Sequence, residues 1–206
     1  MKPPTDRQDG LHSGGKQISQ VQQWVCWGKK DALKGPPPFQ SAIIFLMCGR
    51  YRLSRRKQLV EEYFDCVSDE PDWAPRYNIA PTQPVPVIRQ NPKEPIRKLS
   101  LMRWGLIPSW AKDSSIAAQM INARSETAAA KPAFRDPLAS RRCLVPADGF
   151  YEWLRSGKAK QPYCFEVNAG ELFAFAGVWD RWKDPKIVAS RRLELGVWSR
   201  VTVSPR

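Results

Sequence analysis

The stretch Met47-Cys48-Gly49-Arg50 marks the point at which the chain changes character. The residues before it lack hydrophobic periodicity, whereas strand-like segments and aromatic residues follow it for most of the remaining chain. A Met-Cys-Gly sequence is what a start site with a reactive N-terminal cysteine would look like. If Met47 is removed, Cys48 carries a free α-amine beside its thiol, and this pair can close a thiazolidine ring on an aldehyde. An internal cysteine cannot do so, because its nitrogen is held in an amide.

This boundary predicts three segments. We expect residues 1–46 to be disordered, or to be translated upstream of the real start, because they mix Gly, Gln, Ser, Lys and Pro without a pattern. Residues 47–185 are expected to form one domain. The segment 186–206 breaks the strand pattern and has no evident strand partner. We interpret it as a divergent tail that follows a frameshift or a truncation, so that the C-terminal part of the domain is missing.

The charge of the chain favours a polyanionic partner. Its 206 residues include 33 basic and 20 acidic side chains, which give a net charge of +13. Residues 1–46 carry +3 of this excess and residues 186–206 carry +4, so more than half of it lies outside the expected domain. The basic balance therefore supports nucleic acid as a partner without establishing it.

The cysteine pattern predicts neither a metal site nor a disulfide framework. The chain has no CxxC pair, and its single histidine is His12, in the N-terminal segment. No secretory signal is evident, and the apolar run 42–47 is too short to cross a membrane. We expect a cytoplasmic, nucleoid-associated protein with no membrane partner, no metal and no cofactor. Three cysteines are expected to be small buried apolar residues: Cys66, Cys143 and Cys164.

Strand patterns dominate the expected domain. Ser54–Phe64 reads as a helix that Ser54 can cap, and residues 125–130 can begin a second, short one. The prolines at 84 and 86 restrict the apolar run that follows Tyr77-Asn78-Ile79 to an edge strand or an extended arm. Residues 116–121 are apolar enough for a buried strand. These patterns predict an α+β fold, rich in strands and with few helices, in which a curled antiparallel sheet closes towards a barrel.

Four stretches then carry a resemblance that covers residues 47–185 in unbroken order. They are Cys48-Gly49-Arg50, Arg76-Tyr77-Asn78-Ile79-Ala80-Pro81, Ile121-Asn122-Ala123-Arg124-Ser125-Glu126-Thr127 and Asp148-Gly149-Phe150-Tyr151-Glu152-Trp153. Together with Trp104-Gly105-Leu106-Ile107-Pro108, they resemble the SOS response-associated peptidase (SRAP) family of abasic-site processing proteins. Members of that family form a covalent thiazolidine link from their N-terminal cysteine to abasic sites in single-stranded DNA, and they remove their own initiator methionine.

The resemblance implies a role for seven residues of this chain. The resemblance also implies a monomer that binds single-stranded DNA containing abasic sites and acts in the DNA damage (SOS) response. The implied catalytic residues are Cys48 as nucleophile, Asn122 as the side chain that orients it and Glu152 as the acid/base group; the implied DNA-binding residues are Arg50, Arg124, Pro81 and Trp110. The family also has a histidine in a His-x-Arg-Met-Pro-like stretch, preceded by a threonine-rich strand. This sequence has neither, and we expect a slower reaction as a result.

The residues support the same chemistry without the resemblance. An α-amine has a reference pKa of about 7.7–8.0, so a sizeable part of it is neutral near pH 7 and can form an imine. A carboxyl group partly buried among aromatic residues, as expected for Glu152, would have a raised pKa suited to moving protons. Arginine forks match phosphate oxygens, and aromatic rings stack on unpaired bases.

Other interpretations of these residues stay open. Met-Cys-Gly also begins N-terminal-nucleophile amidohydrolases, although nothing later in the chain resembles them. A non-catalytic single-strand binder, or an inactive fragment, is a further alternative. Taken singly, Asn122 would be a turn or cap residue, Glu152 a surface strand residue, Arg124 a solvated charge and Trp110 a core residue.

Overall fold

The computed structural model describes residues 49–90, 93–183 and 191–198. Met47, Cys48 and the whole of 1–46 lie outside this part, as do most positions of the expected tail. The elements in chain order are β1 (Arg50–Leu53), α1 (Lys57–Phe64), β2 (Cys66–Val67), β3 (Arg76–Ile79), β4 (Pro84–Gln90), β5 (Arg97–Trp104), the 3-10 helix η1 (Ser115–Gln119), β6 (Asn122–Ala123), α2 (Ser125–Ala128), α3 (Pro132–Ser140), β7 (Arg142–Ala147), β8 (Gly149–Ser156), β9 (Ala159–Phe165), β10 (Phe173–Lys183) and β11 (Arg191–Trp198).

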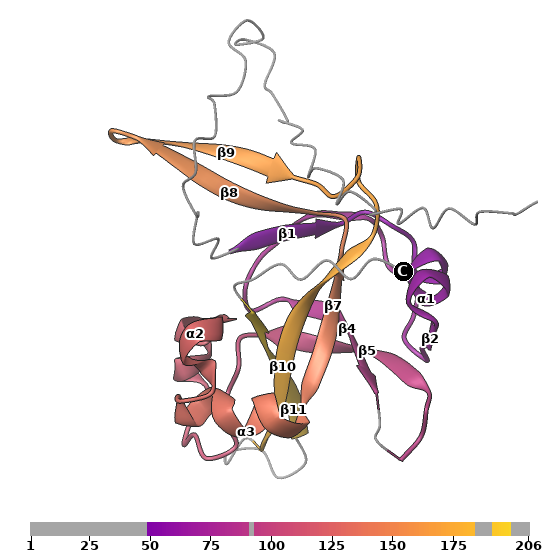
Figure 1. The fold of residues 1–206 in the computed structure, drawn as a ribbon, viewed down its shortest axis with the longest axis vertical. Helices are drawn as coiled ribbons and strands as arrows, with labels where there is room; N and C mark the ends of the chain where they lie inside the picture. Colours follow the sequence, from indigo (N-terminus) through magenta and orange to yellow (C-terminus); the bar gives the residue numbers. More distant parts are fainter. Residues whose placement is uncertain (1–48, 91–92, 184–190, 199–206) are drawn as a thin grey trace, which may run out of the picture.

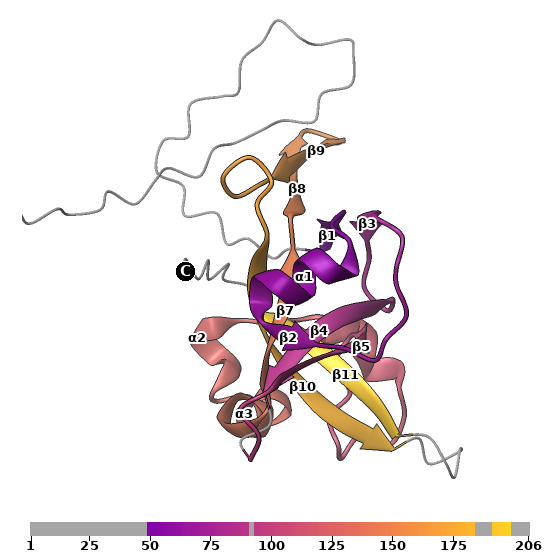
Figure 2. The same cartoon turned by 90° about the vertical axis from the view of Figure 1, so that its right-hand side faces the viewer.

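The strands form two sheets. The smaller sheet has the order β3-β1-β8-β9 and the larger one the order β2-β5-β4-β7-β10-β11-β6. The larger sheet curls, because β11 also pairs with β5 on its far side. In Figures 1 and 2 the β8–β9 hairpin projects away from the curled sheet. The prediction of a strand-rich, curled α+β fold with few helices is confirmed.

Aromatic side chains join the two sheets. The Tyr51 ring of β1 meets Trp104 of β5 edge to face at 5.5 Å and Phe175 of β10 at 5.9 Å. Phe150 of β8 stacks on Phe165 of β9 at 5.3 Å. Tyr51 and Trp104 are each 1% exposed. Rings of this size bury enough apolar surface to fix the smaller sheet against the larger one.

The helices cover the flanks. Figure 2 shows α1 beside β1 and β2, where Val60 and Phe64 bury one face of the helix. The prediction that Ser54 caps α1 is wrong, since the N-cap is Arg56 and makes no side-chain cap bond. The hydroxyl of Ser54 instead donates to Asp148. The short helix α2 confirms the expectation for the residues after Arg124.

Two strand predictions within the expected domain differ from the structure. Residues 115–119 form η1 instead of part of a buried strand at 116–121. β4 is not an edge strand, because it lies between β5 and β7. Its prolines are tolerated since the registered pairing of β4 with β7 is limited to Ile88↔Leu144, beyond both of them.

The expectation that the chain after residue 185 lacks a strand partner is wrong for residues 191–198. β11 pairs antiparallel with β10 over seven positions, and parallel with β5 and β6. The larger sheet is therefore mixed, and not wholly antiparallel as predicted. Within the described residues, no helix has the length and apolar character needed to cross a membrane.

The three cysteines expected in the core are buried there. Cys66 is 9% exposed, Cys143 is 7% exposed and Cys164 is 1% exposed. Burial raises the pKa of Cys66 to about 11, so its thiol is protonated at neutral pH. These cysteines behave as apolar core residues, as predicted.

Candidate active site

Strand β1 brings the start of the domain to the base of the projecting hairpin. Arg50 lies opposite Tyr151 in the antiparallel pairing of β1 with β8, and Tyr51 lies opposite Phe150. The chain that enters β1 through Gly49 therefore approaches the part of β8 that contains Glu152. Cys48 itself lies outside the described residues.

Glu152 combines burial with an unsatisfied oxygen. It lies opposite Tyr163 in the β8–β9 pairing and is half-buried. Its Oε1 atom is buried and accepts no hydrogen bond from the part of the chain that the structure describes. Burial raises the pKa of this carboxyl above its ordinary value, which confirms the direction predicted from its aromatic neighbours. Such a group can exchange a proton closer to neutral pH than an exposed glutamate can.

Strand alternation separates Glu152 from Arg50. Successive side chains of a strand point to opposite faces, so Glu152 shares the face of Phe150 and Tyr51, which contact the larger sheet. Arg50 and Tyr151 belong to the other face. There the Arg50 Nη1 donates to Asn78 Oδ1 at 2.9 Å, and the Tyr151 hydroxyl donates to the Tyr77 carbonyl at 2.7 Å. Arg50 is thus held from β3, on the opposite side of the smaller sheet from the Glu152 carboxyl.

Trp104 connects β1 with the segment that carries Asn122. Its indole Nε1 donates to the Ile121 carbonyl at 2.8 Å while its ring contacts Tyr51. Ile121 directly precedes Asn122, which is half-buried at the start of β6. The Trp104 hub, meaning this ring and its contacts, therefore holds the backbone next to Asn122 against β1, on the same face of the smaller sheet as Glu152.

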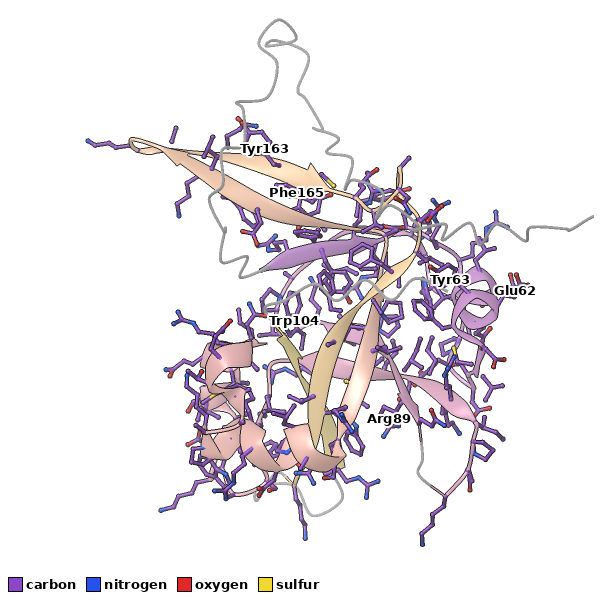
Figure 3. The ribbon with its side chains drawn as sticks, in the orientation of Figure 1. Glu62, Tyr63, Arg89, Trp104, Tyr163 and Phe165 are labelled. Carbon is purple, nitrogen blue, oxygen red and sulfur yellow. The ribbon has the colours of Figure 1, made fainter. Side chains whose placement is uncertain are left out.

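The backbone of Trp104 also fixes the turn that contains Pro81. The Thr82 N–H donates to the Trp104 carbonyl at 2.7 Å, and the Trp104 N–H donates to the Gln83 carbonyl at 3.0 Å. Thr82 has a φ of +71°, a left-handed conformation that costs free energy unless neighbouring contacts hold it. Pro81 is half-buried in a turn whose conformation Trp104 sets. Figure 3 shows Trp104 between the two sheets.

Trp110 is exposed, unlike a core tryptophan. It is 61% exposed and follows Pro108 and Ser109 in a turn that β10 clamps. Asp180, which is 5% exposed, accepts a hydrogen bond from the Ser109 N–H at 3.1 Å, and the Trp182 indole donates to the Ala111 carbonyl at 2.9 Å. This clamp presents the Trp110 ring to solvent from a fixed turn, as a stacking platform would require.

Arg124 is exposed at the N-cap of α2, two residues after Asn122. The two residues therefore leave the end of β6 together, one half-buried and the other in solvent. Of the six predicted site residues that the structure describes, Asn122 and Pro81 adjoin residues that bond to Trp104, and Glu152 lies on the face of the smaller sheet that Tyr51 shares. Arg50 lies on the other face of the smaller sheet, and Trp110 and Arg124 lie on separate turns. Among the described residues, no group of His, Cys, Asp or Glu side chains could hold a metal ion.

A buried carboxylate that the sequence did not single out anchors β1. Asp148 is fully buried. It accepts bonds from the Ser54 N–H at 2.7 Å, the Ser54 hydroxyl at 2.6 Å and the Arg52 Nε at 3.0 Å. Arg52 also pairs with Glu166 at 2.7 Å. Since Asp148 directly precedes β8, it locks the two strands that meet beside Glu152. Its place within Asp148-Gly149-Phe150 was visible in the sequence, but its partners were not.

We expect Asp148→Asn to destabilise the fold by about 3 kcal/mol, because the buried amide NH₂ cannot accept the hydrogen bonds that Ser54 or Arg52 now donates to the carboxylate, and Arg52 is left with Glu166 as its ion-pair partner. The midpoint of thermal unfolding would fall by on the order of 10 °C. Urea unfolding measures the change. Asp136→Asn is the matched control, since that exposed carboxylate pairs, among the described residues, with its neighbour Arg135, and the expected change is within about 0.5 kcal/mol. Equal losses in the two variants would contradict the anchoring role of Asp148.

Comparison with known proteins covers most of the described chain. The model of the family described as SOS response associated peptidase (SRAP) matches residues 47–198. The abasic site processing protein YoqW of Bacillus subtilis (strain 168) is 44% identical over 143 residues, which are 68% of this chain and 63% of that protein. The abasic site processing protein HMCES of Gallus gallus is 34% identical over 151 residues, 57% of this chain and 45% of that protein.

The fold agrees with solved structures. A crystal structure of a protein from Bacteroides thetaiotaomicron superposes with a TM-score of 0.66 at 27% identity, covering 73% of this chain and 67% of that one. One from Bordetella bronchiseptica gives 0.60 at 26% identity, covering 73% and 71%. The chain spans about 63% of the length of the Bacillus relative. The family match extends beyond residue 185 and includes β11.

Proposed function

Because the chain belongs to the SOS response associated peptidase (SRAP) family, we propose that it processes abasic sites in DNA. The observation that carries the proposal is the half-buried carboxyl of Glu152, whose pKa is raised, beside the strand pair that the residues after Cys48 enter. The relatives named as abasic site processing proteins support the same substrate. An abasic sugar offers an aldehyde, and an aldehyde needs a nucleophile and a proton carrier.

Cys48 is the proposed nucleophile. In a chain that begins at Met47, hydrolysis of the Met47–Cys48 amide consumes one water and releases methionine, which frees the α-amine, so the chain acts on its own N-terminus as a peptidase. The neutral amine then adds to C1 of the open sugar, and the resulting carbinolamine loses water to give an imine. The thiolate adds to the imine carbon while the nitrogen takes a proton. This second bond closes a thiazolidine ring, which is a stable cross-link.

Glu152 is the proposed proton carrier for these steps. The closed sugar must lose the proton of its C1 hydroxyl and gain one on the ring oxygen before the aldehyde forms. A carboxylate at the base of the hairpin can accept the first proton, and the protonated acid can return it. Asn122 is proposed to orient the opened sugar, because the Trp104 hub holds its backbone on the same face of the smaller sheet.

Single-stranded DNA is the proposed form of the substrate, in a cytoplasmic DNA-damage response. Trp110 is proposed to stack on an unpaired base, and its exposure on a clamped turn supports this role. Pro81 is proposed to contact the strand from its own rigid turn. Incubating a chain that begins at Cys48 with single-stranded oligonucleotides, with and without an abasic site, tests the function. We expect a protein–DNA band that survives heating and forms only with the oligonucleotide that contains the abasic site. The absence of this band would overturn the proposal.

Arg50 and Arg124 are proposed phosphate contacts. We expect Arg→Gln at either position to weaken binding to single-stranded abasic DNA and to reduce its salt dependence. Each lost contact removes one displaced counterion, so the slope of log affinity against log salt should fall by about 0.7. Filter binding across a salt series, with Cys48→Ala to prevent cross-linking, measures the slope.

Arg135→Gln provides the control for this series, because it removes the same charge from an exposed helix position already paired with Asp136. Its slope should equal that of the parent. The same slope in all three arginine variants would return Arg50 and Arg124 to the class of ordinary surface charges.

A further inference from the structure

Two buried tryptophans each hold the backbone beside a proposed site residue through an indole hydrogen bond. Trp104 is 1% exposed, and its Nε1 donates to the Ile121 carbonyl at 2.8 Å. Trp182 is 2% exposed, and its Nε1 donates to the Ala111 carbonyl at 2.9 Å. The two bonds are matched in donor, in acceptor and in the burial of the tryptophan. They differ in the segment that they hold.

The Trp104 bond holds the segment that carries Asn122. β6 consists of two residues, Asn122 and Ala123, and lies at one end of the larger sheet, where it pairs with β11. The Trp104 indole reaches the carbonyl just before this strand, and the Leu106 N–H donates to the Met120 carbonyl at 3.0 Å. A two-residue edge strand has few ladder bonds to fix its position. The indole bond therefore ties β6 to the Trp104 hub.

The backbone that follows Trp104 is closely packed against η1. Gly105 has a φ of +135°, and a Cβ at this position would lie 2.8 Å from the carbonyl oxygen of Ala117. A glycine is required there because a larger residue would clash with that carbonyl. This close approach fixes the Trp104 backbone relative to the segment that leads into β6, so the indole N–H has a defined position.

The Trp182 bond holds the turn that carries Trp110. β10 grips this turn at two points, since Asp180 accepts from the Ser109 N–H at 3.1 Å and Trp182 donates to the Ala111 carbonyl. The two β10 residues are separated by one position and so lie on the same face of the strand. Trp110 itself is 61% exposed, so its ring has few contacts of its own. The backbone on either side of Trp110 therefore sets the direction of the ring.

We propose that the two buried tryptophans are positioning residues with separate effects. The Trp104 indole N–H positions Asn122 for the chemical step, and the Trp182 indole N–H positions Trp110 for binding of the DNA strand. The inference rests on the proposed function, because it takes the roles of Asn122 and Trp110 from there. A misplacement of about 1 Å near the reacting atoms can cost about 10²-fold in rate, whereas a lost base–aromatic stack weakens binding.

Trp104→Phe and Trp182→Phe each remove one indole N–H and keep an aromatic ring. Single-turnover adduct formation by a chain that begins at Cys48, across a series of abasic-DNA concentrations, gives the saturating rate and the half-saturating concentration. Trp104→Phe is expected to lower the saturating rate about 10- to 100-fold and to leave the half-saturating concentration unchanged. Trp182→Phe is expected to raise the half-saturating concentration about fivefold and to keep the saturating rate.

A purely structural role would act through stability, which the two variants should lose alike. One lost hydrogen bond should lower the midpoint of thermal unfolding by about 2–4 °C in each. Equal changes in rate and in half-saturating concentration in both variants, or no change in either, would overturn the proposal. If a phenylalanine variant does not fold, benzothienylalanine at the same position keeps the ring size and has sulfur in place of the indole N–H, so the same readouts apply.

Asn122→Ala separates this inference from the proposed function. Trp104→Phe should add little to the slow rate of Asn122→Ala, because it acts through that side chain. If Asn122→Ala is slow and Trp104→Phe has the parent's rate, the positioning role fails and the proposed function stands. If Asn122→Ala has the parent's rate, the proposed role of Asn122 fails and the inference fails with it.

NMR of the chain without DNA gives a readout that does not depend on capture of abasic sites. The side-chain amide signals of Asn122 are expected to move in Trp104→Phe and to stay in place in Trp182→Phe. The indole signal of Trp110 should show the reverse. Unchanged Asn122 signals in Trp104→Phe would overturn its positioning role even if the parent forms no adduct.

Discussion

A chain that begins at Cys48 is expected to form a heat-stable adduct with single-stranded abasic DNA, and Cys48→Ala is expected to form none. The thiazolidine needs both the α-amine and the thiol of one residue, and alanine retains only the amine. Denaturing gel electrophoresis after heating measures the adduct. The expected loss is complete for the stable product, which makes this the largest effect among the predictions.

Two further variants separate the role of the Cys48 α-amine from that of its thiol. Cys48→Ser should lose the stable ring but still form an imine that borohydride traps as a secondary amine. A chain in which Met47 is retained and its N-terminus is blocked should form neither product, because the nitrogen of Cys48 is then held in an amide. Cys66→Ala is the matched thiol control, since Cys66 is a buried core residue. Equal adduct from the parent and Cys48→Ala would make Cys48 a structural residue.

The sequence predicted those strands whose own residues show a strand-like pattern of apolar side chains. β8 and β10 alternate or concentrate large apolar residues, and the family motifs placed Glu152, Asn122 and Trp110 on identifiable segments. The direction of the Glu152 pKa shift was also predicted, but its cause is burial on the face towards the larger sheet, since the flanking Tyr151 and Trp153 belong to the opposite face. Local composition was sufficient to predict a feature wherever the contacts that determine it lie within a few residues along the chain.

Features that depend on distant partners were not predictable. The burial of Asp148 depends on Arg52 and Ser54, which lie more than ninety positions earlier. Residues 191–198 have a weak pattern and become a strand because β10 offers a long edge. Residues 115–119 are apolar, but the sequence alone does not distinguish a buried strand from a 3-10 turn.

Trp104 illustrates the same limit at the site itself. Its motif suggested a family position but no role, since neither its bond to the Ile121 carbonyl nor its contact with Tyr51 follows from spacing. The opposite faces of Arg50 and Glu152 likewise follow from the register Arg50↔Tyr151, which sequence cannot supply. As a result, the face of the smaller sheet towards the larger sheet bears Glu152, the proposed acid/base group, and the other face bears Arg50, a proposed phosphate contact.

We expect Glu152→Gln to slow adduct formation by about 10²–10⁴-fold, because glutamine preserves the shape of the side chain but cannot transfer a proton. In the parent, the rate should fall on acidification in two steps. One follows protonation of the Cys48 amine, with a reference pKa of about 7.7–8.0, and the other follows protonation of Glu152, whose pKa lies above its ordinary value. The variant should keep only the amine step. Single-turnover rates across a pH series measure both.

The stability of the same variant gives an independent readout. A carboxyl whose pKa is higher in the folded state than in the unfolded state contributes stability below its unfolded pKa and loses it as pH rises through the folded one. Glu152→Gln should therefore be more stable than the parent near pH 8, with the difference disappearing near the ordinary pKa of glutamate. Glu62→Gln, at an exposed position of α1 (Figure 3), is the matched control and should change neither the rate nor its pH profile. A Glu152→Gln variant with the parent's rate and both acid steps would remove Glu152 from the chemistry, whereas the stability difference would still report its burial.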